Sequence, residues 1–295
     1  MRHGSGVRSA TVPDSLRRDV FRGSEAVRAG LLSWRQLDGA TWRRLYHDVY
    51  VHSAVPITHE LRAEAACLLV PEAIVTGRSA AVLWGVDLAG PMDDVELTVP
   101  PSAGPRRLTG LRVRRADVPP GHRWRRAGIP VTTPEATTVR LAASLPGDDA
   151  VVAVDQMVAS GIVDLAPVRA LAASGRGAGS TRARTVCELA DGLAGSPQET
   201  RLRLLIHRSA LPRPIAQFRV MDGDRFVARV DFAWPDCKVA AEYDGLWHAA
   251  DGQFAKDRRR LNKLRAAGWT VAFVTAADMH RPIELIRSLA AALER

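Results

Sequence analysis

Residues 230–248 read VDFAWPDCKVAAEYDGLWH, and this stretch decides our interpretation of the C-terminal third of the chain. Its two apolar runs predict two β-strands joined by a turn at 235–236. Asp231 lies between Val230 and Phe232, inside a run that we expect to be buried. Because strands disfavour aspartate, this carboxylate requires an explanation beyond local structure.

Two further carboxylates follow in the second predicted strand. Glu242 and Asp244 are two residues apart, so on a strand their side chains project from the same face. Carboxylates that are buried together are costly unless a cation lies among them, and oxygen-ligated Mg²⁺ is the usual cation. Together with Asp231 they predict a site for Mg²⁺ or Mn²⁺. Asp244 followed by Gly245 is also a common turn dipeptide, which leaves an interpretation without metal open for that residue.

The flanks of this stretch predict a complete α/β domain over residues 195–295. Ser196, Pro197 and Glu199 have the spacing of a helix N-cap, a first helical residue and a capping-box acid. Apolar periodicity then predicts the element order α-β-β-β-α-β-α. The expected helices cover 197–210, 253–267 and 283–293, and the expected strands cover 216–220, 226–234, 238–243 and 269–275.

Four segments of this domain resemble a bacterial family related to the very-short-patch-repair endonucleases: SPQETRLRLL, RVDFAWPD, VAAEYDGLWH and KDRRRLNKLRAAGWTVAFVT. The resemblance implies a restriction-endonuclease-like α/β core with a catalytic site. In that site Asp231, Glu242 and Asp244 bind the metal, Glu199 is an outer acid, and His248 lies near the attacking or leaving oxygen. The metal would polarise the phosphate while a nearby base orients water for attack.

One position departs from the pattern of that family. The restriction-type motif Glu-x-Lys uses its lysine to steady negative charge on the phosphate, whereas this chain reads Glu-Tyr-Asp at 242–244. His248 is one candidate replacement, and Lys238 or Lys256 would serve if either lies nearby in space. His248 is also explained as an ordinary surface or core histidine, and Glu199 as a capping residue alone. Metal binding therefore need not imply hydrolysis.

The first sixty residues predict a small helical domain that carries a β-hairpin. Residues 41–52, TWRRLYHDVYVH, alternate apolar and polar positions around a turn at 47–48. Short helices before an arginine-bearing hairpin predict a winged helix-turn-helix, whose wing would place Arg43 and Arg44 on a DNA backbone. A helical cap with solvated arginines is the alternative. The expected helices cover 13–21, 25–29 and 34–37, the last two with Ser24 and Ser33 as N-caps.

The run EAVRAGLLSWRQLDGATWRRLYHDVYV resembles the N-terminal winged-helix domain of AbiEi-type antitoxins. The resemblance covers about the first sixty residues and continues weakly through the middle region. It implies a repressor of its own operon that is paired with a nucleotidyltransferase toxin.

Residues 61–194 predict a mixed α/β middle region without a catalytic motif. Within it, residues 106–126 contain eight arginines and one acid, Asp117, with Trp124 interleaved. A solvated face and a phosphate-facing surface both explain such a segment. The candidate DNA contacts along the whole chain are Arg35, Arg43, Arg44, Arg106, Arg107, Arg112, Arg114, Arg115, Lys256, Arg258 and Arg259.

The composition favours a nucleic-acid partner. The 295 residues carry a formal charge of +9, which suits a polyanion: DNA first, and an anionic membrane surface second. No apolar run approaches the ~20 residues of a membrane span, and the N-terminus lacks the apolar core of a signal peptide, so we expect a cytoplasmic protein.

The sequence thus predicts two competing functions, divided over domains at 1–60, 61–194 and 195–295. The first is a double-stranded-DNA-binding, antitoxin-like regulator with a degenerate nuclease-like domain. The second is a Mg²⁺-dependent DNA endonuclease that its winged helix targets. The missing lysine and the antitoxin-like N-terminal region favour the first.

Overall fold

The stretch that decides the fold forms the centre of a four-stranded sheet in a computed structural model of the chain. Strands β10 (Arg225–Trp234) and β11 (Val239–Tyr243) are antiparallel neighbours, joined by a 3-10 turn at Pro235–Cys237. Strand β9 (Ile215–Asp222) pairs antiparallel with β10, and β12 (Thr270–Val274) pairs parallel with β11. The sheet order is β12-β11-β10-β9. The structure describes residues 13–104, 107–244 and 253–294, with the backbone alone at 253–257.

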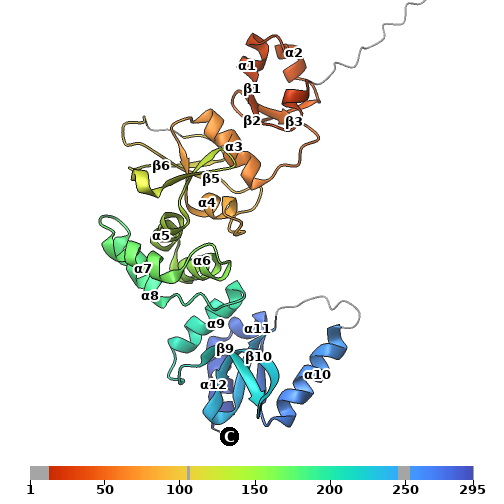
Figure 1. Cartoon of the computed structure of the whole chain (residues 1–295), viewed down its shortest axis with the longest axis vertical. Helices are drawn as coiled ribbons and strands as arrows, with labels where there is room; N and C mark the ends of the chain where they lie inside the picture. Colours follow the sequence, from red (N-terminus) through yellow and green to blue (C-terminus); the bar gives the residue numbers. More distant parts are fainter. Residues whose placement is uncertain (1–12, 105–106, 245–252, 295) are drawn as a thin grey trace, which may run out of the picture. The chain divides into compact units, whose positions relative to one another are not determined.

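Helices cover both faces of this sheet (Figure 1). One face packs Phe232, Trp234 and Ala241 against α9 and α12, and the other packs Ala240 against Leu264 of α10. Successive residues of a strand point to opposite faces, which is why neighbours on β11 join different cores. The expected order α-β-β-β-α-β-α is confirmed, with the short helix α11 in addition. The helices are α9 (Pro197–His207), α10 (Gln253–Ala266), α11 (Ala276–Met279) and α12 (Pro282–Leu293).

A buried ion pair joins this α/β core to the helices that precede it in the chain. Asp155 of α6 has 0% of its surface exposed, and its Oδ2 accepts hydrogen bonds from Thr200 Oγ1 at 2.8 Å and Arg203 Nη2 at 2.7 Å, both on α9. Its Oδ1 accepts the N–H groups of Asp191 at 3.0 Å and Gly192 at 2.9 Å. Four donors thereby offset the cost of burying the carboxylate. The preceding helices are α6 (Gly147–Ala159), α7 (Leu165–Ser174) and α8 (Ser180–Leu189).

The chain forms two compact units, divided after Arg140 inside helix α5 (Pro134–Ser144). The sequence instead predicts three domains, with boundaries at 60 and 194. Just before the predicted boundary at 194, the N–H groups of Asp191 and Gly192 bind Asp155, and Ala194 is buried. The α/β core therefore belongs to one unit with α6, α7 and α8.

The first unit contains a five-stranded sheet of order β6-β5-β4-β8-β7. Its inner strands are apolar and buried, with Val75, Leu97 and Val131 at no more than 1% exposure, and helices α3 and α4 pack against them. The edge strands β6 and β7 carry six of the eight arginines of the segment 106–126. The elements are α3 (His59–Leu69), β4 (Ile74–Val75), α4 (Gly77–Leu83), β5 (Val95–Val99), β6 (Leu111–Arg115), β7 (Arg123–Arg126), β8 (Ile129–Thr132) and a 3-10 turn at Pro120–His122.

The N-terminal region of this unit contains short helices and a three-stranded sheet of order β1-β3-β2. The predicted hairpin and the helix capped by Ser33 are confirmed. The predicted helix over 13–21 is wrong, because only Asp14–Leu16 is helical, as a 3-10 turn, and Phe21 belongs to strand β1. Ser24 does not cap α1; it binds the carboxylate of Asp48. The elements are β1 (Phe21–Arg22), α1 (Gly23–Arg28), α2 (Trp34–Leu37), β2 (Trp42–Tyr46) and β3 (Val49–His52).

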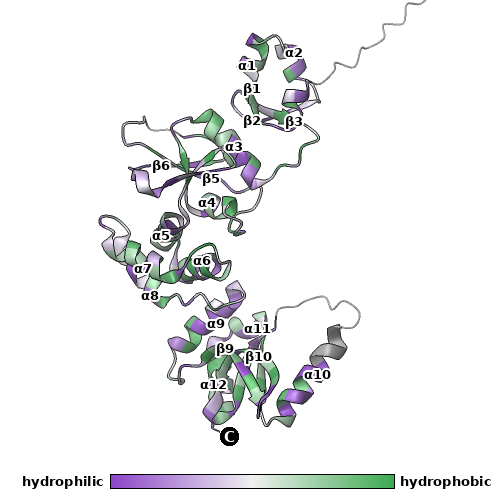
Figure 2. Cartoon of the chain, viewed as in Figure 1, coloured by the Kyte–Doolittle hydropathy of each residue, from purple (hydrophilic) through white to green (hydrophobic). Residues whose placement is uncertain are grey.

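Hydropathy follows the layers of helices and sheets. Figure 2 shows hydrophobic residues along the inner strands of both larger sheets, whereas α10 is largely hydrophilic. Within the described ranges, no helix combines the length and the apolar character that crossing a bilayer requires.

We expect Arg203→Ala to lower the free energy of unfolding by about 3–5 kcal/mol, because it leaves the Asp155 carboxylate buried without its cation. Arg201→Ala is the matched control on the same helix: Arg201 pairs with Asp149 of α6 at 2.6 Å, but both side chains are partly exposed. Loss of that pair should cost at most about 1 kcal/mol. Urea unfolding measures both. Equal losses would contradict the role assigned to the buried pair.

Candidate functional site

Asp231 occupies an irregular point in the C-terminal sheet. Gln217, on the neighbouring strand β9, adopts the left-handed backbone conformation at φ 52°, between Phe218, which pairs with Val230, and Ala216, which pairs with Phe232. The Asp231 carboxylate accepts the backbone N–H of Tyr243 on β11 at 2.9 Å. Burial and then the nearby Glu199 carboxylate raise the pKa of Asp231, against the opposing effects of that N–H, Arg260 and Arg229. Asp231 is therefore a partly buried acid beside a strained stretch of backbone.

Glu199 reaches this point from the first turn of α9. Its Oε2 accepts the backbone N–H of Gly195 at 2.8 Å and Gln217 Nε2 at 3.0 Å. Ser196 Oγ accepts the N–H of Glu199 at 3.2 Å, so the predicted N-cap is confirmed. The reciprocal half of the predicted capping box differs, since Glu199 binds the N–H of Gly195 instead of that of Ser196. Glu199 thus has a local structural role as well as its proximity to Asp231.

Glu242 is paired with an arginine that the sequence analysis did not single out. Arg260 of α10 donates from Nη1 to Oε2 at 2.7 Å and from Nη2 to Oε1 at 2.6 Å, a two-pronged ion pair. Nη2 also donates to the backbone carbonyl of Arg229 at 2.6 Å. Only 8% of Glu242 is exposed. The cation beside Glu242 is therefore the guanidinium of Arg260, which lies eighteen residues later in the chain. The spacing of residues along the sequence does not reveal this pair.

Among the remaining predicted site residues, the structure describes Asp244 and Lys238. Asp244 is exposed at the end of β11, where its N–H donates to the carbonyl of Val274 at 2.8 Å. His248 lies outside the described residues, and so does the side chain of Lys256. Lys238, at the opposite end of β11, approaches the carbonyl of Ala267 at 3.5 Å. The cation that the described structure brings to Glu242 is Arg260, which is not one of these three candidates.

The described side chains do not fit a divalent metal in this arrangement. Both oxygens of Glu242 are bound by Arg260, and one oxygen of Glu199 already accepts two hydrogen bonds. Across the described ranges of the chain, no three His, Cys, Asp or Glu side chains gather as they would around a metal ion. The site therefore combines Asp231, whose pKa is raised, with the nearby Glu199. The third acid, Glu242, has its charge neutralised by Arg260.

A separate basic hollow lies in the first unit, where the hairpin meets the loop before β6. It has a volume of about 480 Å³. Arg44 and His47 line it from the hairpin and Arg107 from the loop, and no acid is among its lining residues. Neither arginine forms an ion pair among the described residues. The lining residues are Arg44, Leu45, Tyr46, His47, Leu69, Arg107, Leu108 and Thr109.

The other predicted DNA contacts are dispersed. Arg43 donates to the carbonyl of Ser53 at 3.1 Å, and Arg112 lies 4.0 Å from Glu96 on the neighbouring strand. Arg106 lies outside the described residues. Exposed positions are occupied by Arg35, Arg114, Arg115, Arg258 and Arg259.

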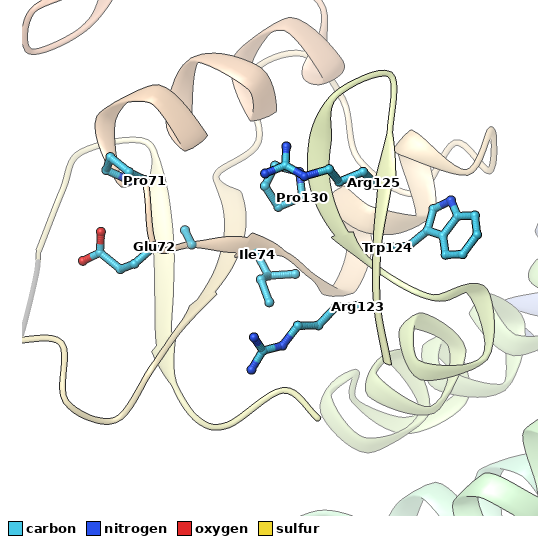
Figure 3. A pocket seen from close by; sticks show the side chains of 8 residues that line it. Pro71, Glu72, Ile74, Arg123, Trp124, Arg125 and Pro130 are labelled. Atoms are coloured by element: carbon cyan, nitrogen blue, oxygen red, sulfur yellow. The ribbon is translucent and has the colours of Figure 1, made fainter. Parts of the chain in front are cut away.

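A second basic hollow, of about 510 Å³, lies beside edge strand β7 (Figure 3). Arg123 and Arg125 line it together with Ile74 and Pro130. These two arginines belong to the basic segment 106–126. Because they are two residues apart on one strand, their side chains point to the same face.

We expect Asp231→Asn to raise the free energy of unfolding at pH 7. The folded pKa lies above the unfolded value of about 3.9, so Asp231 opposes folding while it is ionised in both states. This penalty fades as the pH falls through the folded pKa toward 3.9. The gain from the variant should therefore be largest at neutral pH and vanish near pH 4.

Urea unfolding at several pH values measures this difference. Asp236→Asn, in the exposed turn before β11, is the control and should leave stability nearly unchanged. An Asp231→Asn variant that is less stable than the native protein at pH 7 would mean that the arginines outweigh burial.

Comparison with known proteins gives relatives without an assigned role. The sequence matches no protein-family model. A crystal structure of the RV2827C protein from Mycobacterium tuberculosis is similar over 70% of this chain and 84% of that one, at 18% identity and a TM-score of 0.39.

Two curated proteins are more similar in sequence. They are the uncharacterized protein Rv2248 of M. tuberculosis strain H37Rv and the uncharacterized protein MT2308 of strain CDC 1551. Each is 30% identical over 261 residues, which cover 85% of this chain and 92% of the relative. The chain therefore belongs to the same family as these two mycobacterial proteins.

Proposed function

We propose that this protein is a double-stranded-DNA-binding regulator whose first unit holds the phosphate backbone. The observation that carries the proposal is the hollow lined by Arg44, His47 and Arg107 without an acid. Three cationic or hydrogen-donating side chains around one concave surface suit a phosphate, and one arginine can donate two hydrogen bonds to the same phosphate. The formal charge of +9 gives the long-range attraction that such binding uses.

The elements around this hollow support a winged-helix assignment. Helices α1 and α2 precede the hairpin of β2 and β3, and Arg44 belongs to that hairpin. A wing that contacts phosphates fixes the register of a protein on DNA, while a neighbouring helix reads bases. With the resemblance to AbiEi-type antitoxins, this supports a repressor paired with a nucleotidyltransferase toxin.

The acidic set supports a nuclease-like domain that does not cleave. Arg260 neutralises Glu242, so the third carboxylate is not available to a metal in this arrangement. The domain would then retain its restriction-endonuclease-like sheet for DNA or partner contact, and α10 would present Arg258 and Arg259 outward.

We expect Arg44→Ala combined with Arg107→Ala to weaken binding to a labelled duplex about tenfold or more at moderate salt. The slope of log affinity against log salt is negative, and each lost phosphate contact should reduce its magnitude by about 1. Arg287→Ala on α12, an exposed arginine outside this hollow, should leave both quantities unchanged. Fluorescence anisotropy at four salt concentrations measures them. An unchanged slope in the double variant, with an unchanged melting temperature, would refute the phosphate site.

We also expect supercoiled plasmid to stay intact when it is incubated with the protein and Mg²⁺ or Mn²⁺. The reason is that Glu242 is occupied by a guanidinium instead of a metal. Agarose electrophoresis detects nicking. Cleavage that Asp231→Asn abolishes would replace this proposal with the metal-dependent endonuclease, and Arg260 would then supply the cation that the Glu-x-Lys motif lacks.

A further inference from the structure

We infer that strand β7 (Arg123–Arg126) is a stacking platform for an unpaired strand of nucleic acid. The inference rests on the proposed nucleic-acid function, and it assigns a second site with a different preference from the duplex site at Arg44 and Arg107. The occupant is a single-stranded segment of DNA, as at a melted or frayed duplex end.

Strand β7 is the edge of its sheet, because it pairs with β8 and with no other described strand. All four of its residues are exposed, and Trp124 has 60% of its surface in contact with solvent. A tryptophan exposed to this degree buries little apolar area within the fold. Its indole therefore offers an open π-face.

The arginines of the strand are held by neutral groups. Arg123 Nε donates to the carbonyl of Val118 at 2.7 Å, and Arg125 Nη1 donates to the carbonyl of Gly128 at 2.6 Å. Neither forms an ion pair with a described carboxylate. Carbonyls orient a guanidinium without cancelling its charge, so both arginines remain attractive to phosphate. The acid that lines the same hollow is Glu72.

Alternation along the strand separates the two kinds of contact. The register pairs Arg123 with Thr132 and Arg125 with Pro130, which places the two arginines on one face. Figure 3 shows the two arginine side chains on one side of the strand and the Trp124 side chain on the other, and all three residues line the hollow. A nucleic-acid strand that follows this edge can place its phosphates at the arginines and one base against the indole.

This arrangement favours unpaired DNA. In a duplex the base faces are stacked on one another, so an exposed indole gains nothing from them without unstacking, whereas a single strand offers its base faces freely. Addition of a protein strand to the edge is disfavoured, because four consecutive exposed side chains include three arginines, and charged edges resist strand pairing.

The test uses the full chain and three labelled probes of equal length. The probes are oligo-dT, the same oligonucleotide with abasic sites that keep every phosphate, and a duplex. Anisotropy should show that the native protein binds oligo-dT roughly 5- to 100-fold more tightly than the abasic strand, the range expected for one stacked base. Trp124→Ala should lose this preference and bind the duplex within twofold of the native protein. Trp124→Phe should keep most of it.

Phe226→Ala is the matched control, because Phe226 is an exposed strand aromatic beneath Arg219, at 4.8 Å, in the second unit. This variant should bind all three probes with the affinity of the native protein. An undiminished preference in Trp124→Ala, or equal binding of dT and abasic strands by the native protein, overturns the inference. If the protein binds the duplex but not the single strand, the stacking platform on β7 is refuted and the proposed function stands. If it binds the single strand but not the duplex, the proposed function is refuted and the stacking platform stands.

Discussion

The buried pair between Asp155 and Arg203 is the constraint on which the second unit depends. Two charges withdrawn from water are costly, so the structure must give each of them its partners in a fixed geometry. Asp155 obtains four donors, and Arg203 also donates from Nη1 to the carbonyl of Leu189 at 2.7 Å. The positions of α6, of the turn at 191–192 and of α9 are thereby fixed together.

The acidic site inherits its geometry from that constraint. Helix α9 carries both Glu199 and Arg203, about one turn apart, so fixing Arg203 also positions the Glu199 carboxylate near Asp231. The neighbouring Gln217 donates a hydrogen bond to Glu199 and adopts a left-handed backbone conformation within strand β9. Such local strain persists only where the surroundings determine it, and it is common at functional sites. Here it leaves an acid whose pKa is raised beside an ion pair that neutralises Glu242.

The chain uses arginine in two ways, and both occur in the first unit, where Arg78 also pairs with Glu96 at 3.1 Å. In the second unit Arg201, Arg203, Arg208 and Arg260 each meet a carboxylate, so their charge is consumed in holding helices to one another and to the sheet. In the first unit Arg123 and Arg125 meet backbone carbonyls, which orient them and leave their charge in place. The net positive charge is therefore most available for a polyanion at arginines whose described partners are neutral.

The elements of the C-terminal core, the hairpin at 41–52 and the N-cap at Ser196 could be predicted from the sequence, because apolar periodicity and capping signals act over a few residues. The same local signals failed at 13–21, where tertiary contacts draw Phe21 into a strand beside Tyr50. The charge partnerships could not be predicted in this way: Arg260 neutralises Glu242, and Arg44 and Arg107 line one hollow, only because of how the elements pack. Charge partnerships depend on distance in space and on burial, and both are fixed by packing between elements, which no local spacing encodes.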